Sequence, residues 1–324
     1  MSFAIRIHEV GGPEVLQWQE VTVGAPGPGE VRLRHGAVGL NFIDVYFRTG
    51  VYGAEVPFTP GLEASGVVEA LGEGVSSLRV GERVAYAAPP AGAYSEERLM
   101  PADRLVKVPD GVSDELAAAM MLKGMTARYL LRRSYRVQAG DTILFHAAAG
   151  GVGLIACQWA KSLGATVIGT VGSDEKAELA AAHGCDHPIV YTRENFVERV
   201  KSITGGEGVP VVYDSVGKDT FMDSLDCLRP LGSMVIFGQS SGSVPPLDVG
   251  LLAAKGSLFL TRPSLMTYTA KREDLVATAE ELFQVVQTGA VKLEINQRFP
   301  LRDAADAHRA LEARQTTGST ILTV

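Results

Sequence analysis

The hydrophobic residues of this chain follow one spacing in its first third and a different spacing in its middle. In the first third, apolar residues alternate with polar ones in short runs that Gly and Pro interrupt, as at Phe3, Ile5 and Ile7. A period of two is typical of half-buried β-strands, and Gly and Pro mark the turns between them. The alternation therefore predicts a largely β module.

From residue 142 onward, near-continuous apolar runs alternate with helical patterns. After the opening run, further runs lie at 166–171, 188–191, 209–214, 233–238 and 257–260, with helical patterns at 175–183, 195–204 and 220–228. Apolar runs separated by helices predict a parallel sheet that is covered on both faces. Together they supply the six strands of a doubly wound Rossmann domain, so the predicted fold class is α/β.

The last part of the chain combines an amphipathic helical pattern at 271–288 with strand patterns at 291–299 and 320–324. We expect these strands to return to the β module. The predicted organisation is a first domain formed by residues 1–124 and 263–324, with a dinucleotide-binding domain at 125–262 between its two parts.

The opening run leads into a turn of small residues, Ala147–Gly153, and then into a helical pattern. This is the context of the G-x-G-x-x-G fingerprint, in which the turn and the helix N-terminus receive a pyrophosphate. Gly150 and Gly153 fill the second and third glycine positions, while Ala148 takes the first. Such a turn can also serve packing alone. The turn residues expected to contact a cofactor are Ala149, Gly150, Gly151 and Val152.

The end of the second strand discriminates between NAD and NADP. NAD-binding domains usually place Asp or Glu there to hold the ribose 2′-hydroxyl, but no acid stands between Ile168 and Ser173. A neutral end leaves room for a 2′-phosphate, to which Ser173 can donate and with which Lys176 can pair. Asp174 and Glu175 lie close by and weaken this argument, although acids are also favoured in the first turn of a helix. The pattern predicts NADPH.

Two small polar loops, 214–217 and 237–242, follow later strands of the predicted sheet. Open α/β sheets bind ligands at the carboxyl ends of their strands. Either loop alone is compatible with a plain Ser/Gly connection, but two on one edge favour contact with nicotinamide and ribose. The residues expected there are Ser215, Phe237, Gly238, Gln239 and Ser240.

Two further places carry candidate chemistry. Asn41 and Tyr46 follow a strand and start a helical turn, where they offer neutral donors and acceptors, although Asn41 is equally suited to be a plain N-cap. Lys123 and Thr126 lie in a helical pattern before the glycine turn, where a lysine is more often a solvated surface charge. No nucleophile–base arrangement is evident, which favours a reaction whose difficult step a cofactor carries.

Composition narrows the class of protein. The chain has 324 residues, of which 46% are hydrophobic and 21% charged, enough for two domains with sizeable cores. A net charge of −7 argues against a general nucleic-acid binder. Three scattered cysteines exclude a disulfide framework and a four-cysteine zinc site, and we expect all three thiols to be buried. With no membrane-spanning stretch and no signal peptide, the expected location is the cytoplasm.

Several linked motifs resemble the medium-chain dehydrogenase/reductase superfamily. They are Asn41–Asp44, Pro60–Gly66, Val80–Val84 and the turn Ala147–Gly153. Within that superfamily the chain is similar, over essentially its whole length, to the zinc-free quinone oxidoreductases, the ζ-crystallin-like group. The resemblance implies a GroES-like catalytic domain, formed by the predicted β module, beside an NADPH-binding Rossmann domain.

The resemblance also implies the absence of a metal. Zinc-dependent members carry a ligand cysteine where Asn41 stands, and Gly-His-Glu where this chain has Gly61-Leu62-Glu63. Catalytic zinc needs three protein ligands and an open position. We therefore expect no metal-dependent step.

For the site residues, the resemblance implies particular roles. Asn41 and Tyr46 are expected to be catalytic and to lie near the nicotinamide, with Lys123 and Thr126 on the nicotinamide side. The residues expected at the 2′-phosphate are Ser173, Lys176 and Tyr191, and the neighbouring Gly172 is expected to contact the cofactor.

The expected function is an NADPH-dependent, zinc-independent reductase of a small quinone that binds in an interdomain cleft. The resemblance further implies a homodimer. Two alternatives stay open: a reductase of α,β-unsaturated carbonyls (enals or enones), and a non-catalytic RNA-binding or structural crystallin-like protein. RNA binding fits the acidic charge poorly, and membrane association is not expected. The sequence leaves open which acceptor is used and whether electrons leave singly or as hydride.

Overall fold

The computed structural model describes residues 1–324, which form two compact units. Unit 1 contains residues 1–125, 269–283 and 293–324, and unit 2 contains residues 126–268 and 284–292. The domain boundaries drawn from the sequence, after residues 124 and 262, stay a prediction.

Unit 1 consists mainly of β-strands. Its larger sheet has seven strands in the order β14-β15-β3-β4-β5-β7, with β6 paired to β3, and a separate antiparallel sheet joins β1 and β2. The strands are β1 (Ser2–Arg6), β2 (Gln17–Val21), β3 (Glu30–Gly39), β4 (Glu63–Leu71), β5 (Arg83–Ala87), β6 (Glu97–Pro101), β7 (Val106–Lys107), β14 (Ile295–Pro300) and β15 (Ser319–Thr323). The predicted β module is confirmed.

Few helices accompany these strands. Helix α2 begins in unit 1 and ends in unit 2, and the Ser113 hydroxyl caps it by accepting from the Leu116 backbone N–H at 3.1 Å. Short 3₁₀ turns occupy 13–15, 102–104 and 301–303. The helices are α1 (Phe42–Arg48), α2 (Asp114–Tyr129), α9 (Arg272–Gln287) and α10 (Ala304–Glu312).

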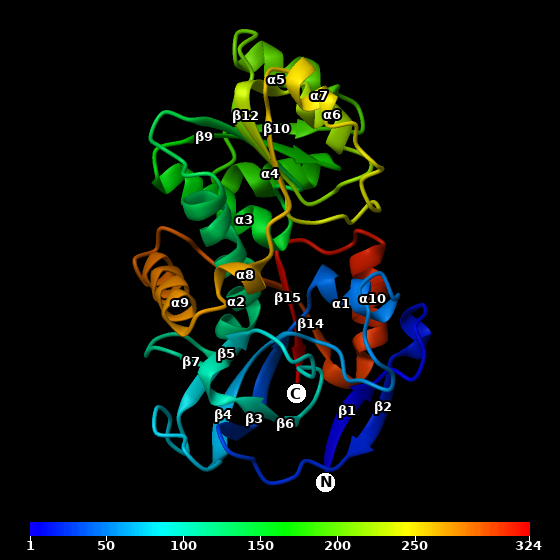
Figure 1. Ribbon diagram of the computed structural model, residues 1–324, viewed down its shortest axis with the longest axis vertical. Coiled ribbons are helices and arrows are strands. Elements are labelled where there is room, and N and C mark those ends of the chain that lie inside the picture. The colour runs from blue at the N-terminus through cyan, green and yellow to red at the C-terminus, as the bar shows by residue number, and fades with distance from the viewer. The chain divides into compact units, whose positions relative to one another are not determined.

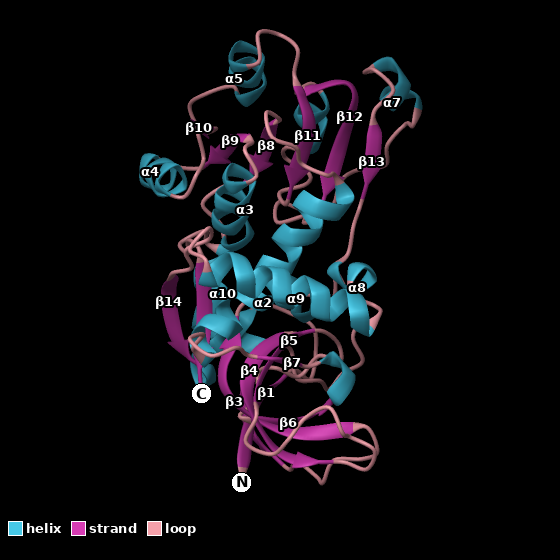
Figure 2. Ribbon diagram, turned by 90° about the vertical axis from the view of Figure 1, so that its left-hand side faces the viewer, coloured by secondary structure: helices cyan, strands magenta, loops and turns pink.

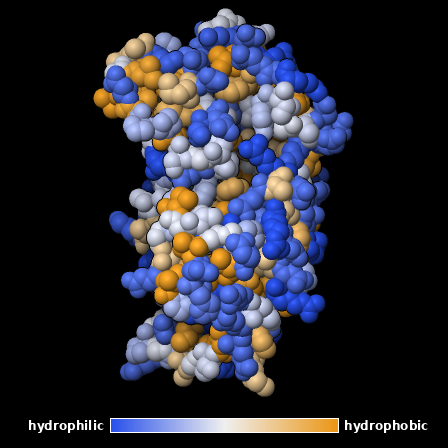
Figure 3. All heavy atoms as spheres, turned by 90° about the vertical axis from the view of Figure 1, so that its right-hand side faces the viewer, coloured by the Kyte–Doolittle hydropathy of each residue, from blue (hydrophilic) through white to orange (hydrophobic).

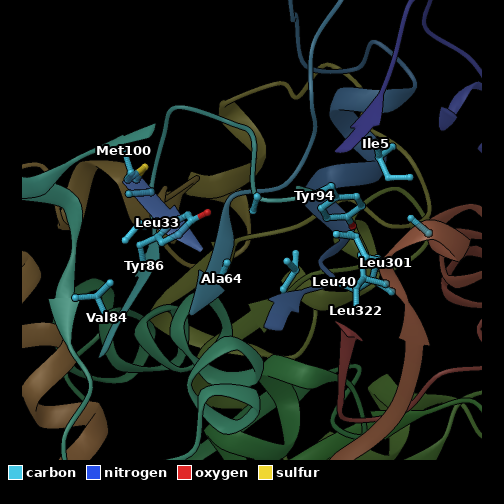
Figure 4. Close-up of a cluster of buried hydrophobic side chains, with 14 of the residues drawn as sticks. Ile5, Leu33, Leu40, Ala64, Val84, Tyr86, Tyr94, Met100, Leu301 and Leu322 are labelled. Carbon is cyan, nitrogen blue, oxygen red and sulfur yellow. The ribbon is translucent and has the colours of Figure 1, made fainter. Parts of the chain in front are cut away.

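The core of unit 1 combines both ends of the chain. Ile5 and Leu33 from the first strands share one buried cluster with Leu301 and Leu322 (Figure 4). Strand β15, red in Figure 1, pairs antiparallel with β3. Burial of this apolar surface is the main favourable term that closes the unit.

Unit 2 alternates strands with helices and contains one six-stranded sheet, in the order β10-β9-β8-β11-β12-β13 (Figure 2). All five strand pairs are parallel. The strands are β8 (Thr142–His146), β9 (Thr166–Val171), β10 (His187–Val190), β11 (Val209–Asp214), β12 (Leu228–Ile236) and β13 (Phe259–Thr261). The helices are α3 (Gly151–Ser162), α4 (Asp174–Ala182), α5 (Phe196–Ile203), α6 (Phe221–Leu225), α7 (Gly250–Ala254) and α8 (Leu265–Tyr268), and a π-helical turn spans Leu130–Ser134.

This strand order is that of the Rossmann fold, 3-2-1-4-5-6, so the fold class is confirmed. The order reverses at β8, which pairs with β9 on one side and β11 on the other. Ligands of open α/β sheets bind beyond the carboxyl ends of the strands at this reversal. The loops after β8, β9, β11 and β12 are therefore the part of unit 2 where a ligand is expected to bind.

The surface offers no sign of a spanning segment. No helix combines the length and the apolar character needed to cross a bilayer. On the face drawn in Figure 3, hydrophilic residues are interspersed with smaller hydrophobic groups. The three cysteines are buried and free, as the sequence predicts.

Candidate active site

The glycine turn after β8 uses its glycines for two different purposes. A Cβ on Gly153 would lie 2.4 Å from the Ala147 carbonyl oxygen, so only glycine fits there. A Cβ on Gly150 would lie 3.1 Å from that same oxygen and 4.0 Å from the Ala147 Cβ, at ordinary or slightly tight contact distances. Gly153 therefore closes the turn onto α3, whereas Gly150 leaves room above it.

That room suits an anion. Gly150 is the N-cap of α3, a helix of twelve residues with no acid in its first turn. The first N–H groups of a helix lack intrahelical acceptors, and its dipole favours negative charge at this end. The turn residues Ala149–Val152 are thus arranged as a cradle that a pyrophosphate fits, with bulk absent where it has to approach.

The loops after β9 and β10 bring the predicted 2′-phosphate residues together. The Tyr191 backbone N–H donates to the Val171 carbonyl at 3.1 Å, and a Cβ on Gly172 would lie 3.2 Å from the Tyr191 hydroxyl. Ser173 caps α4 by accepting from the Lys176 backbone N–H at 3.4 Å. Gly172, Ser173, Lys176 and Tyr191 therefore share one edge of the sheet.

The two acids that follow Ser173 have local roles. Asp174 pairs with Arg193 at 2.6 Å, and this ion pair holds the pKa of the Asp174 carboxyl below its usual value. The Ser173 hydroxyl similarly lowers the pKa of Glu175. Both stand in the first turn of α4, where the helix dipole favours them, so neither resembles the acid that ends the second strand in NAD enzymes.

The loops after β11 and β12 contact each other directly. The Ser240 N–H donates to the Ser215 carbonyl at 3.1 Å, and a Cβ on Gly238 would lie 2.6 Å from that oxygen. Phe237 packs its ring against Phe145, with centroids 5.6 Å apart. The predicted set, which also includes Gln239, is therefore one continuous patch at the carboxyl edge.

In unit 1, a buried carboxylate organises the polar residues of α1 and α2. Glu63 Oε2 accepts from Asn41 Nδ2 at 2.7 Å and from Lys123 Nζ at 3.1 Å, while Oε1 accepts from the Leu122 N–H at 2.6 Å. Asn41 and Lys123 are each 5% exposed, and Glu63 is fully buried. The interpretation of Lys123 as a solvated surface charge is therefore wrong, because its ammonium group neutralises a buried acid.

Asn41 is the N-cap of α1, but its side chain does more than cap. Because Nδ2 donates to Glu63, the amide oxygen Oδ1 is the acceptor atom of the side chain, and in the capping box of α1 it faces the Asp44 backbone N–H. Asp44 completes the cap by accepting from the Asn41 backbone N–H at 3.1 Å. One turn later, the buried Tyr46 packs its ring against Phe42 and Tyr52, with centroids 5.4 and 5.2 Å apart.

Thr126 lies one turn beyond Lys123 on α2 and is 6% exposed. Asn41, Tyr46 and Lys123 thus belong to unit 1, whereas Thr126 and all the other predicted cofactor residues belong to unit 2. Their assignment to a cofactor or substrate stays a prediction.

Asp44 also ends a buried chain of hydrogen bonds that sequence reasoning missed. Arg48 donates to His308 Nδ1 at 3.0 Å, since a guanidinium only donates. The opposite ring nitrogen then carries the proton and donates to the Tyr94 hydroxyl, which in turn donates to Asp44 Oδ2, each at 3.0 Å. Burial, with the Arg48 charge, lowers the pKa of His308 to about 3, and burial raises the pKa of Asp44 to about 7.

Residues of these types do not gather into a metal centre. No group of three or more His, Cys, Asp or Glu side chains is placed to hold a metal ion. Glu63 and Asp44 escaped the sequence analysis because an isolated acid usually marks a solvated surface. The Gly61-Leu62-Glu63 motif was the one available signal for Glu63.

Comparison with known proteins agrees with both units. Residues 27–110 match the family model of the alcohol dehydrogenase GroES-like domain, and residues 151–283 match that of the zinc-binding dehydrogenases. A quinone oxidoreductase of Pseudomonas aeruginosa is 53% identical over 323 residues, covering 99% of each chain. A 2-haloacrylate reductase of a Burkholderia species is 50% identical over 329 residues, with 99% of each covered.

Solved structures agree as well. The quinone oxidoreductase of Escherichia coli, solved in complex with NADPH, superposes with a TM-score of 0.98 at 48% identity and covers 99% of this chain and 100% of its own. Full-length likeness at this identity, with both domain models in place, shows more than a shared fold. The chain is an oxidoreductase and belongs to the quinone oxidoreductases of the medium-chain dehydrogenase/reductase superfamily.

Proposed function

We propose that this protein is an NADPH-dependent quinone reductase. The observation that carries the proposal is the carboxyl edge of unit 2, where an acid-free phosphate cradle adjoins Ser173, Lys176 and Tyr191. NADPH, when bound, supplies the reducing equivalents. The relatives named above support the combination of NADPH with a quinone, since one is a quinone oxidoreductase and another is solved with NADPH.

The chain's own residues bind and orient. Residues 149–152 receive the pyrophosphate, and Ser173, Lys176 and Tyr191 grip the 2′-phosphate. The loops after β11 and β12 support the ribose and nicotinamide. In unit 1, Glu63 fixes the Asn41 amide so that Oδ1 accepts from the nicotinamide carboxamide, and Lys123 and Tyr46 offer donors to an acceptor oxygen. None of these roles requires a shifted pKa.

The acceptor can be tested by turnover. With saturating NADPH, we expect kcat/KM on a panel of benzoquinones and naphthoquinones to exceed that on a matched panel of enals and haloacrylates. The 2-haloacrylate reductase relative favours the second panel as the alternative. Faster turnover of the enals and haloacrylates would reject quinone reduction. Spin-resonance detection of semiquinone during turnover separates single-electron from hydride transfer.

Cofactor choice can be tested at Lys176. Removal of its charge in Lys176→Ala is expected to weaken NADPH binding about tenfold or more and to leave NADH binding almost unchanged, because only NADPH has a 2′-phosphate. Lys201→Ala, an exposed lysine on α5, is the matched control. Calorimetric titration of both cofactors measures the effect, and equal losses for NADPH and NADH contradict the assignment.

We further propose that turnover needs no zinc. Two observations at the positions where zinc-dependent members carry ligands support this. The Asn41 amide nitrogen donates to Glu63, and Leu62 is apolar and buried. Metal analysis of active protein is expected to find far less than one zinc per chain, and EDTA is expected to leave kcat unchanged. Loss of activity on chelation, restored by zinc, contradicts the proposal.

A homodimer is also proposed. Strand β13 lies at the edge of the six-stranded sheet, and its Phe259 and Leu260 are 62% and 39% exposed. An open, apolar edge strand is suited to pair with its copy about a two-fold axis. Leu260→Lys is expected to shift the mass measured by light scattering from dimer to monomer, whereas Val249→Lys, exposed on another segment, is not. A monomeric wild-type protein contradicts the proposal.

A further inference from the structure

Beneath the carboxyl edge of unit 2 runs a buried hydrogen-bond network centred on His146, the last residue of β8. Its Nδ1 lies 2.8 Å from the Thr170 hydroxyl on β9, and its Nε2 lies 2.8 Å from the Ser224 hydroxyl on α6. His146 and Ser224 are fully buried, and Thr170 is 2% exposed. The cofactor roles described above do not use any of these side chains.

The protons in this network can be assigned by counting donors. The Ser224 hydroxyl donates its one proton to the Thr220 carbonyl at 2.7 Å, so towards His146 it accepts. Nε2 of His146 therefore carries the ring proton and Nδ1 accepts from Thr170. Burial lowers the pKa of His146 more than the nearby Asp214 carboxylate raises it, which agrees with a neutral ring.

The network continues to a third strand. The Thr220 hydroxyl donates to Asp214 Oδ2 at 2.8 Å, and Asp214 is fully buried at the end of β11. Its other oxygen, Oδ1, accepts from the backbone N–H groups of Val216 and Gly217 at 2.7 and 3.1 Å. Asp214 thus shapes the loop that contains Ser215.

Each strand end in this network leads into a loop that the proposed function assigns to one part of the cofactor. His146 precedes the phosphate turn, and the Thr170 carbonyl accepts from the Ala148 N–H of that turn at 3.1 Å. Thr170 is two residues from Gly172, and Asp214 adjoins Ser215. We propose that His146, Thr170, Ser224, Thr220 and Asp214 act as one positioning network that fixes the three loops in a common register for NADPH.

This inference rests on the proposed function. It predicts an effect on NADPH binding that a network with a purely structural role would not have. Ser224 lies on α6 and belongs to none of the loops assigned to the cofactor. If the network sets the loops, loss of its hydroxyl is expected to weaken NADPH binding. If the network merely stabilises the sheet, the same loss lowers the unfolding temperature and leaves binding intact.

The experiment is calorimetric titration of NADPH into Thr170→Val and Ser224→Ala, with unfolding temperatures measured in parallel. The expected result is a roughly five- to tenfold rise in Kd for each, the scale of one lost hydrogen bond. Thr170→Ser keeps the hydroxyl and is expected to restore the wild-type Kd. Tyr213→Phe is the control, because it removes a buried hydrogen bond from β11 to the Leu130 carbonyl, outside the network.

The proposal is overturned if the Kd for NADPH of both Thr170→Val and Ser224→Ala stays within about twofold of the wild-type value. It is also overturned if Tyr213→Phe raises the Kd for NADPH as much as these two variants do. Wild-type protein that binds no NADPH overturns the proposed function, and the network with it. Both variants keep the volume of the original side chain nearly unchanged. Should one fail to fold, the other still decides, since each removes a different contact of His146.

Discussion

At the scale of single residues, the orientation of Asn41 and Lys123 depends on Glu63. The carboxylate of Glu63 is fully buried and accepts three hydrogen bonds, two of them at Oε2. A buried charge of this kind is tolerated only when it is paired and hydrogen-bonded. Removing the charge of Glu63 therefore affects Asn41 and Lys123 together.

Glu63→Gln tests this dependence. The substitution leaves the Lys123 ammonium group without its anion, and such losses cost about 3–5 kcal/mol when one partner of a buried pair is removed. We expect a lower unfolding temperature and a fall in kcat larger than the change in KM for NADPH. Glu69→Gln, a half-buried acid on the same strand that pairs with Arg34, is the control. Wild-type kcat in folded Glu63→Gln contradicts the role.

The reasons why the sequence hides such residues are physical. Glu63 contacts partners that lie 22 and 60 positions away along the chain, so no local spacing in the sequence predicts these contacts. The same holds for His308, which lies 260 positions from Arg48. Asn41 and Tyr46, by contrast, stood out because they share one helical turn directly after a strand.

At the scale of elements, the pattern of apolar residues was enough to predict the Rossmann sheet. All six strands were expected, because strands buried on both faces are apolar throughout and the exposed edge strand β13 also consists largely of apolar residues. Strand β6 was not predicted. Its Arg98 points inwards, is 8% exposed and donates to the Pro90 carbonyl at 2.9 Å, so a charged residue occupies a position where the alternation requires an apolar one.

The turn between β8 and α3 yields a paired prediction. Gly150→Val is expected to fold and to abolish NADPH binding, because its side chain occupies the open side of the turn. Gly153→Ala is expected to destabilise unit 2 by several kcal/mol, because its Cβ would lie 2.4 Å from a backbone oxygen. Titration and thermal unfolding distinguish the two, and unchanged NADPH affinity in folded Gly150→Val contradicts the cradle.

At the scale of the whole molecule, buried titratable groups make stability depend on pH, and three of them in unit 1 have large pKa shifts. Burial lowers the pKa of His35 to about 4 and that of His308 to about 3, so their contributions are present above pH 6.5 and are lost as pH falls through those values. Burial raises the pKa of Asp44 to about 7, so its contribution is present at low pH and is lost as pH rises through 7.

Between pH 4 and 6.5 the two histidines outweigh the single acid. The net difference of one proton predicts that stability rises by about 1.4 kcal/mol per pH unit from these groups, with a maximum near pH 6.5. Asp44→Asn removes the opposing contribution and is expected to steepen the rise. Thermal unfolding at a series of pH values measures it, and an unfolding temperature that is flat over this window contradicts the prediction.

The pairing of β15 with β3 has a consequence for how the protein is made. Residues 126–268 of unit 2 form one continuous segment, so that segment is available for folding as soon as it leaves the ribosome. Strand β3 is synthesised much earlier but meets its neighbour β15 only when residues 319–323 emerge. Only the end of β3 at Ala37–Gly39 waits for β15, because β6 already pairs with Glu30–Arg34 on the same edge. That short open end closes last, so it is the part of the larger sheet that stays exposed to non-native pairing, and to chaperones, during most of translation.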